Sequence, residues 1–256
     1  MNNELKQALI KVPAVTALFW VTKILATTFG ETAGDALSMS LNLGYLLSTL
    51  IFAVIFILFL VFQISSKSYK PALYWATIIA STTVGTTLAD FVDRSLGIGY
   101  VGGSSILLAL VLGTLLLWYK TEGSISPYTV NRPKVEIFYW LTITFSQTLG
   151  TALGDWSADT AGLGYVGGII LFSGLILLIL ALHYWTKVPK TLLFWAAFVL
   201  TRPLGAVVGD FLDKPLDHGG LNLSRFTASF VLLLGICVFV YLSNKICDRQ
   251  LSTHTS

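Results

Sequence analysis

The sequence predicts an all-α integral membrane protein with eight transmembrane helices, arranged as four tandem two-helix repeats. Of the 256 residues, 55% are hydrophobic and 11% charged, with a mean hydropathy of +0.77, whereas an ordinary soluble domain has roughly 25% charged residues. The second observation is a segment that occurs four times, as FWVTKILATTFGETAGD, YWATIIASTTVGTTLAD, YWLTITFSQTLGTALGD and FWAAFVLTRPLGAVVGD. A fixed internal period of this kind sets the architecture of a chain.

The spacing inside the repeated segment is invariant. A Trp stands fifteen residues before an Asp in each copy, and the four pairs are Trp20 and Asp35, Trp75 and Asp90, Trp140 and Asp155, and Trp195 and Asp210. We expect one membrane domain over residues 1–256, with repeats at about 11–66, 67–120, 132–187 and 188–245 and a connector between halves at about 121–131.

Each repeat divides into two apolar segments. The first begins near a proline, which a helix accepts in its first turn, and the second follows a glycine-rich turn. The expected helices span about 13–37, 44–64, 71–92, 99–119, 134–157, 164–185, 190–212 and 222–243. Segments of about 20 apolar residues are long enough to cross a bilayer.

The basic residues predict the orientation. Of 16 Lys and Arg, eleven lie in the terminal segments or in the connectors between repeats: Lys6, Lys11, Lys67, Lys70, Lys120, Arg132, Lys134, Lys187, Lys190, Lys245 and Arg249. By the positive-inside rule, both termini and these connectors are cytoplasmic. Because each repeat has two helices, all four copies face the same way, around a pseudo-symmetry axis along the membrane normal rather than as inverted repeats.

Small residues precede each repeated Asp. The sets are Gly30 and Gly34, Gly85 and Ala89, Gly150 and Gly154, and Gly205 and Gly209. Small residues one turn apart allow helix backbones to approach closely, so we expect helix packing here.

The acidic residues predict a cation-attracting outer mouth. Asp35, Asp90, Asp155 and Asp210 end the first helices, where the helix dipole already disfavours an anion, and Asp93 and Asp213 follow in repeats two and four. Together with Glu31, these residues form the candidate cation pathway, and Glu31, Asp35, Asp90 and Asp210 form a candidate metal site. The alternative is that each Asp caps the turn that follows it.

Two basic residues lie deeper along the helices. Lys23 is expected near the midplane, with Glu31 or an Asp of another repeat as its partner, and Arg202 is expected to pair with Asp210 or Glu31. A buried ion pair that fixes packing and a role in transport are both open.

Hydroxyl side chains and one amide lie along the same part of each repeat, between the Trp and the Asp. The candidate polar lining is Thr27, Thr28, Thr82, Thr83, Gln147 and Thr148. Oxygen ligands suit magnesium, manganese or calcium better than copper or zinc. The alternative, and for most of these side chains the favoured one, is that each hydroxyl bonds a carbonyl of its own helix.

The four two-helix units, with their Trp and Gly-x-x-x-Gly-Asp, resemble a bacterial family of uncharacterised membrane-anchored proteins built from a repeat of unknown function. The resemblance covers about residues 11 to 245. It implies the repeat architecture and a bacterial inner-membrane location, and it implies no particular activity.

The residues favour a transporter or channel for a small cation. The expected cation is a divalent metal such as manganese or magnesium, and proton coupling of the transport stays open. The alternatives are an integral-membrane enzyme, although the sequence lacks His-Glu-x-x-His and Gly-x-Ser-x-Gly, and a non-transporting structural membrane protein. The expected partners are the lipid bilayer and the cation. No nucleic acid is expected from a net charge of +3, no cofactor is predicted, and Cys237 and Cys247 indicate neither a disulfide nor a metal site. The oligomeric state stays open.

Overall fold

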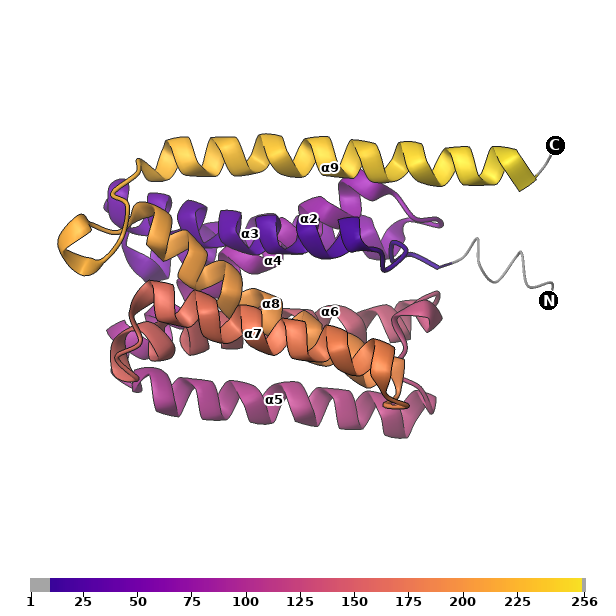
Figure 1. The fold of residues 1–256 in the computed structure, drawn as a ribbon, viewed down its shortest axis with the longest axis horizontal. Coiled ribbons are helices and arrows are strands. Elements are labelled where there is room, and N and C mark those ends of the chain that lie inside the picture. The colour runs from indigo at the N-terminus through magenta and orange to yellow at the C-terminus, as the bar shows by residue number, and fades with distance from the viewer. Residues whose placement is uncertain (1–9, 255–256) are drawn as a thin grey trace.

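The computed structural model describes residues 10–254, and their side chains as far as residue 246. Lys6 and the side chains of Cys247 and Arg249 therefore lie outside the described residues. The described part is all-helical, with eight long helices that run along the longest axis of the molecule (Figure 1). They are α2 (Ala17–Asp35), α3 (Gly44–Ser65), α4 (Pro71–Asp90), α5 (Gly99–Glu122), α6 (Pro133–Asp155), α7 (Gly164–Trp185), α8 (Lys190–Asp213) and α9 (Arg225–His254).

The helix ends follow from local sequence signals. Pro71 and Pro133 occupy the first turns of α4 and α6, and the Thr16 hydroxyl accepts a hydrogen bond from the Phe19 amide at the start of α2. After the repeated Asp, the first three copies continue into five-residue π-helices, η1 (Ala36–Ser40), η2 (Phe91–Ser95) and η4 (Trp156–Thr160). Glycines at φ values of 73°, 75° and 63° then start α3, α5 and α7 (Gly44, Gly99 and Gly164).

The first helices of the four repeats form a closed inner ring. Helix α2 packs against α4, α4 against α6, α6 against α8, and α8 against α2. Close backbone approach explains this order, because at least one glycine of each inner helix faces the next inner helix. A Cβ on Gly34 would lie 2.9 Å from Cγ2 of Thr86, one on Gly85 3.0 Å from the Gln147 carbonyl carbon, and one on Gly154 2.8 Å from Cβ of Ala206.

The second helices cover the ring in an order that crosses the repeat boundaries. Helix α3 packs mainly on α4, α5 on α6, α7 on α8, and α9 on α2. Each outer helix therefore covers the first helix of the following repeat, and α9 closes the circle by returning to the first. Figure 1 shows α9 and α5 along opposite sides of the bundle.

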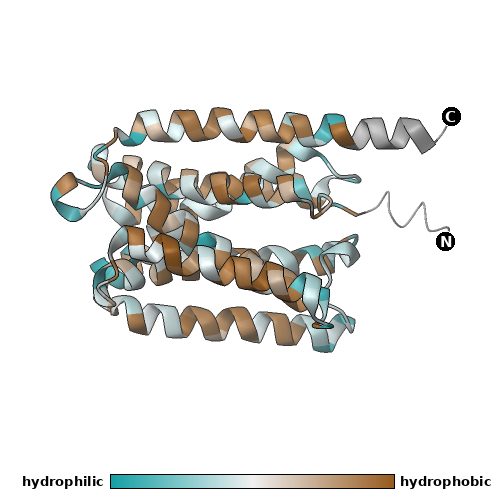
Figure 2. Ribbon diagram, viewed as in Figure 1, coloured by the Kyte–Doolittle hydropathy of each residue, from teal (hydrophilic) through white to brown (hydrophobic). Residues whose placement is uncertain are grey.

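Five helices are long and apolar enough to cross a membrane by length and composition: α3, α5, α7, α8 and the Arg225–Ile246 part of α9. The outer helices are brown along much of their length in Figure 2, with hydrophilic residues gathered towards the ends of the bundle. Helices α2, α4 and α6 do not meet the same test. They lie in the ring under the outer helices, and their polar residues face one another rather than lipid.

Candidate functional site

The interior of the ring is built from equivalent positions of the four repeats, four residues apart along each inner helix. At one end, the aspartate layer consists of Asp35, Asp90, Asp155 and Asp210, all buried. The next three buried sets are Glu31, Thr86, Thr151 and Ala206; then Thr27, Thr82, Gln147 and Arg202; and then Lys23, Ile78, Ile143 and Phe198. The fifth set, Phe19, Tyr74, Tyr139 and Phe194, begins an aromatic layer that also contains Trp75, Trp140 and Trp195. The repeat Trp residues thus pack inside the bundle, except that Trp20 is only partly buried.

Two basic side chains bridge the aspartate layer in matching ways. Nε of Arg94 lies 3.0 Å from Asp90, and its Nη2 lies 3.1 Å from Asp155. Lys214 contacts Asp35 and lies 3.1 Å from Asp210. Each base therefore joins the Asp of its own helix to the Asp of the next inner helix. For Asp35, Asp90 and Asp155 the capping alternative is wrong, because their side chains make no capping bond to the π-helices that follow.

The additional acids of repeats two and four differ in their partners. Asp213 pairs with Nε of Arg225 at 2.7 Å, and the same nitrogen lies 3.9 Å from Asp35. Asp93 occupies the equivalent position in repeat two, but neither of its oxygens accepts a hydrogen bond from a described residue. Six buried carboxylates thus face three cationic side chains at this end of the bundle, so the buried acids outnumber the bases that pair with them.

Three of these groups lie outside the apolar spans and have shifted pKa values. Burial lowers the pKa of Lys214, but Asp210, Asp35 and Asp213 outweigh it and hold that pKa well above its usual value. Burial likewise lowers the pKa of Arg94, and Asp90 and Asp155 more than compensate. Burial raises the pKa of Asp93 to about 6, against the attraction of Arg94. Lys214 and Arg94 therefore remain charged at neutral pH.

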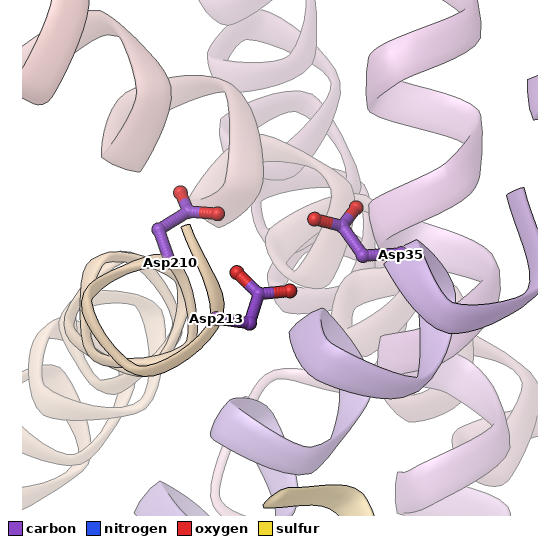
Figure 3. A group of neighbouring side chains, drawn as sticks. All are labelled: Asp35, Asp210 and Asp213. Carbon is purple, nitrogen blue, oxygen red and sulfur yellow. The ribbon is translucent and has the colours of Figure 1, made fainter. Parts of the chain in front are cut away.

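One group of carboxylates is compact enough to hold a cation. Oxygens of Asp35, Asp210 and Asp213 all lie within 4.8 Å of one another. Figure 3 shows these side chains converging from α2 and from the end of α8. Of the four residues expected to form a metal site, this group contains Asp35 and Asp210, whereas Asp90 lies with Arg94 and Glu31 lies one layer deeper.

Glu31 and Arg202 form a fully buried ion pair in the middle of the ring. Both Nη1 and Nη2 of Arg202 donate to Oε2 of Glu31 at 3.0 Å. Nη2 also donates to the hydroxyls of Thr86, at 2.6 Å, and Thr151. One guanidinium on α8 therefore contacts all three other inner helices. Asp210 and Glu31 were the two partners expected for Arg202, and the partner in the structure is Glu31.

Lys23 has a different environment from the one expected. Its side chain is fully buried, but Nζ lies 3.5 Å from Oε1 of Gln147 and 4.1 Å from the centre of the Phe198 ring. No carboxylate pairs with it among the described residues. The expected pair with Glu31 or an Asp is wrong, because Arg202 takes Glu31 and the Asp side chains lie three layers away.

Most of the predicted polar lining bonds to its own helix. Thr28 donates to the Ile24 carbonyl at 3.0 Å, Thr83 to Ile79 at 2.6 Å and Thr148 to Thr144 at 3.0 Å. Thr27 also reaches across to the Thr201 carbonyl at 3.1 Å. Thr82 and Gln147 differ, since Oγ1 of Thr82 and Nε2 of Gln147 have no partner among the described residues.

The opposite end of the ring carries an ion pair that the sequence did not indicate. Nζ of Lys11 lies 2.6 Å from Glu136 in the first turn of α6 and 2.9 Å from the Ile64 carbonyl, while its backbone amide donates to Val130 at 3.1 Å. Both side chains are buried. The sequence shows that Glu136 lies in a first helical turn, but no sequence pattern identifies Lys11 as its partner. The segment before α2 is thereby fastened across this end of the bundle.

Apolar outer helices around a polar, four-times repeated interior define a multi-pass helical membrane protein with internal repeats. Four stretches match the model of a family described as Repeat of Unknown Function (DUF347), at residues 18–69, 73–124, 138–188 and 193–245. The chain belongs to this family, as the repeated Trp and Asp residues indicated. No curated protein and no solved structure matches it.

Proposed function

We propose that this protein transports a small cation across a membrane, with the aspartate layer as the outer entrance and a divalent metal such as manganese or magnesium as the cargo. The observation that carries the proposal is the convergence of one carboxylate from each inner helix at one end of the ring, with Asp93 and Asp213 beside them. Burial of so many acids is costly, and a helix C-terminus adds to that cost. Hard oxygen ligands match hard divalent cations.

The proposed membrane arrangement has all eight helices spanning the bilayer, with four parallel repeats around an axis along the membrane normal. Support comes from the cyclic order of the inner helices and from Arg94 and Lys214, which stand 120 residues apart and bridge equivalent acids. Helices α2, α4 and α6 tolerate polar residues because protein surrounds them. The charge bias of the connectors supports cytoplasmic termini. The location that we propose is a bacterial inner membrane.

Reporter fusions test this orientation. Fusions after Lys67, Lys120 and Lys187 are each expected to report the cytoplasm, because every connector follows an even number of spans and carries basic residues. The readout is a pair of reporters active on opposite sides of the membrane. A periplasmic signal after any of the three residues contradicts the parallel arrangement.

The basic residues of the entrance act as tethered counter-ions in the proposed cycle. Lys214 and Arg94 pair with the four aspartates when no cargo is bound, so their two positive charges offset part of the negative charge. An arriving cation takes their place on the carboxylates. Asp35, Asp210 and Asp213 are the nearest set of oxygens for this exchange. Deeper in the ring, Arg202 and Lys23 oppose passage of a bare cation, so passage requires a change in the packing of the inner helices.

The same ion pairs also favour a second candidate, a non-transporting membrane protein. In that case Arg94, Lys214 and Arg225 serve only to hold the helix ends together. Cation flux separates the two candidates.

Flux of manganese or magnesium into proteoliposomes is expected for the wild type and is expected to fall by roughly tenfold or more in Asp210→Asn, since the variant removes a charged ligand. The matched control is Asp159→Asn, an exposed acid at the same end of the bundle that contacts Tyr100. Melting temperatures in detergent show whether each variant is folded. Wild-type flux no higher than in protein-free liposomes, or equal flux in both variants, contradicts the transport proposal.

A further inference from the structure

The middle of the ring contains buried side chains whose hydrogen-bond donors are only partly satisfied. Thr82, Gln147 and Arg202 occupy equivalent positions in repeats two, three and four, and Lys23 lies one layer towards the aromatic end. All four side chains are fully buried. They project from all four inner helices, so the groups surround the centre of the ring rather than one face of it.

The hydrogen bonding of these side chains is incomplete. An ammonium group has three donors, and Lys23 uses one of them in a 3.5 Å contact with Oε1 of Gln147. Nε2 of Gln147, Nε of Arg202 and Oγ1 of Thr82 have no partner among the described residues. Buried polar groups in folded proteins are nearly always hydrogen-bonded. Nε2 of Gln147 and Nε of Arg202 are donors only and cannot satisfy each other. The Thr82 hydroxyl could accept, but it lies within hydrogen-bonding distance of neither, so the centre requires an acceptor.

The charges of the side chains at the centre of the ring indicate which kind of acceptor is required. Arg202 is matched by Glu31, while Lys23 has no carboxylate partner among the described residues. A buried lysine without a partner favours its uncharged form, and the ammonium form requires a negative charge beside it. A water molecule supplies acceptor lone pairs but no charge, whereas an anion supplies both.

We infer that the centre of the inner ring binds one small monovalent anion of the halide class between Lys23 and Gln147. Nζ of Lys23 supplies the charge and Nε2 of Gln147 a neutral donor, while Oε1 of Gln147 keeps its contact with Lys23. Nε of Arg202 and the hydroxyl of Thr82 are the further donors. The inference does not rest on the proposed cation transport, although an anion here lowers the electrostatic barrier that Arg202 and Lys23 present to a cation.

Equilibrium binding of radioactive chloride to the purified full-length protein in detergent tests this site, with gluconate keeping the ionic strength constant. Saturable binding to a single class of sites is expected for the wild type. Gln147→Leu is expected to weaken it about tenfold, since one donor to a charged ligand is lost, and Lys23→Met is expected to abolish it. Tyr139→Phe is the control, because it removes a buried hydroxyl that bonds Tyr74 at 2.7 Å and leaves all four donors in place.

Absence of saturable chloride binding by the wild type overturns the inference, as does unchanged binding by Gln147→Leu. If Lys23→Met does not fold, Gln147→Leu and Thr82→Val carry the test, because neither removes a charge. Binding is measured without flux, so a failed transport assay leaves this result intact.

Discussion

Replacing Glu31 by Gln is expected to destabilise the protein by about 3–5 kcal/mol, because it leaves the buried Arg202 guanidinium without its counter-ion. Adding Arg202→Met to Glu31→Gln is expected to recover most of the loss, since no uncompensated partner then remains. Adding Lys23→Met instead is expected to recover little, because Lys23 contacts Gln147 and Phe198 rather than Glu31. Unfolding of the purified variants in detergent gives both double-mutant cycles.

The two cycles share Glu31→Gln, so each serves as the control for the other. A larger coupling between Glu31 and Lys23 than between Glu31 and Arg202 contradicts the arrangement of the ring centre. Additive effects in both cycles mean that Glu31 pairs with neither base.

The second large effect is expected from adding a methyl group between two inner helices. A Cβ on Gly150 overlaps Cβ and Cγ of Arg202 and lies 3.0 Å from Cδ of Pro203, so Gly150→Ala is expected to destabilise the protein by about 1–3 kcal/mol or more. The overlap also displaces the Arg202 stem, and with it the pair with Glu31. Thermal unfolding in detergent measures the change.

Two glycines of the outer helices provide matched controls. A Cβ on Gly113 in α5 or Gly174 in α7 meets no atom within 4 Å. Ala at either position is expected to change stability by about 0–1 kcal/mol, in the stabilising direction, through its better helix propensity. A loss at Gly113 or Gly174 as large as at Gly150 argues against the close packing of α6 on α8.

The sequence was sufficient for the helices, the family and the positions of the unusual residues. Spacing alone placed the four aspartates at equivalent positions, and the structure shows all four buried at one end of the ring. The glycine pairs indicated close packing because their effect is local and steric. Glu31 was one of two partners expected for Arg202. Helix periodicity limits the distance that a side chain can span, but it does not show which helices are neighbours, so it could not decide between them.

Contacts between repeats could not be derived in the same way. Arg94 and Lys214 follow their own aspartates by four residues, a spacing visible in the sequence. That they also reach Asp155 and Asp35 depends on the cyclic order of the inner helices, which hydropathy does not encode. The packing of α9 on α2 and the pair of Lys11 with Glu136 are likewise long-range contacts without a sequence signal.

The most direct test of the central claim is equilibrium binding of manganese to purified wild-type protein and to Lys214→Gln. If the aspartate layer holds cargo and Lys214 is its tethered counter-ion, removal of that side chain frees Asp35 and Asp210 and is expected to tighten manganese binding by roughly tenfold or more, even if stability falls. Lys187→Gln, an exposed lysine near the opposite end of the bundle, is expected to leave affinity unchanged. Manganese binding that is absent from the wild type, or that is equally weak with and without Lys214, would contradict a cation site in the aspartate layer.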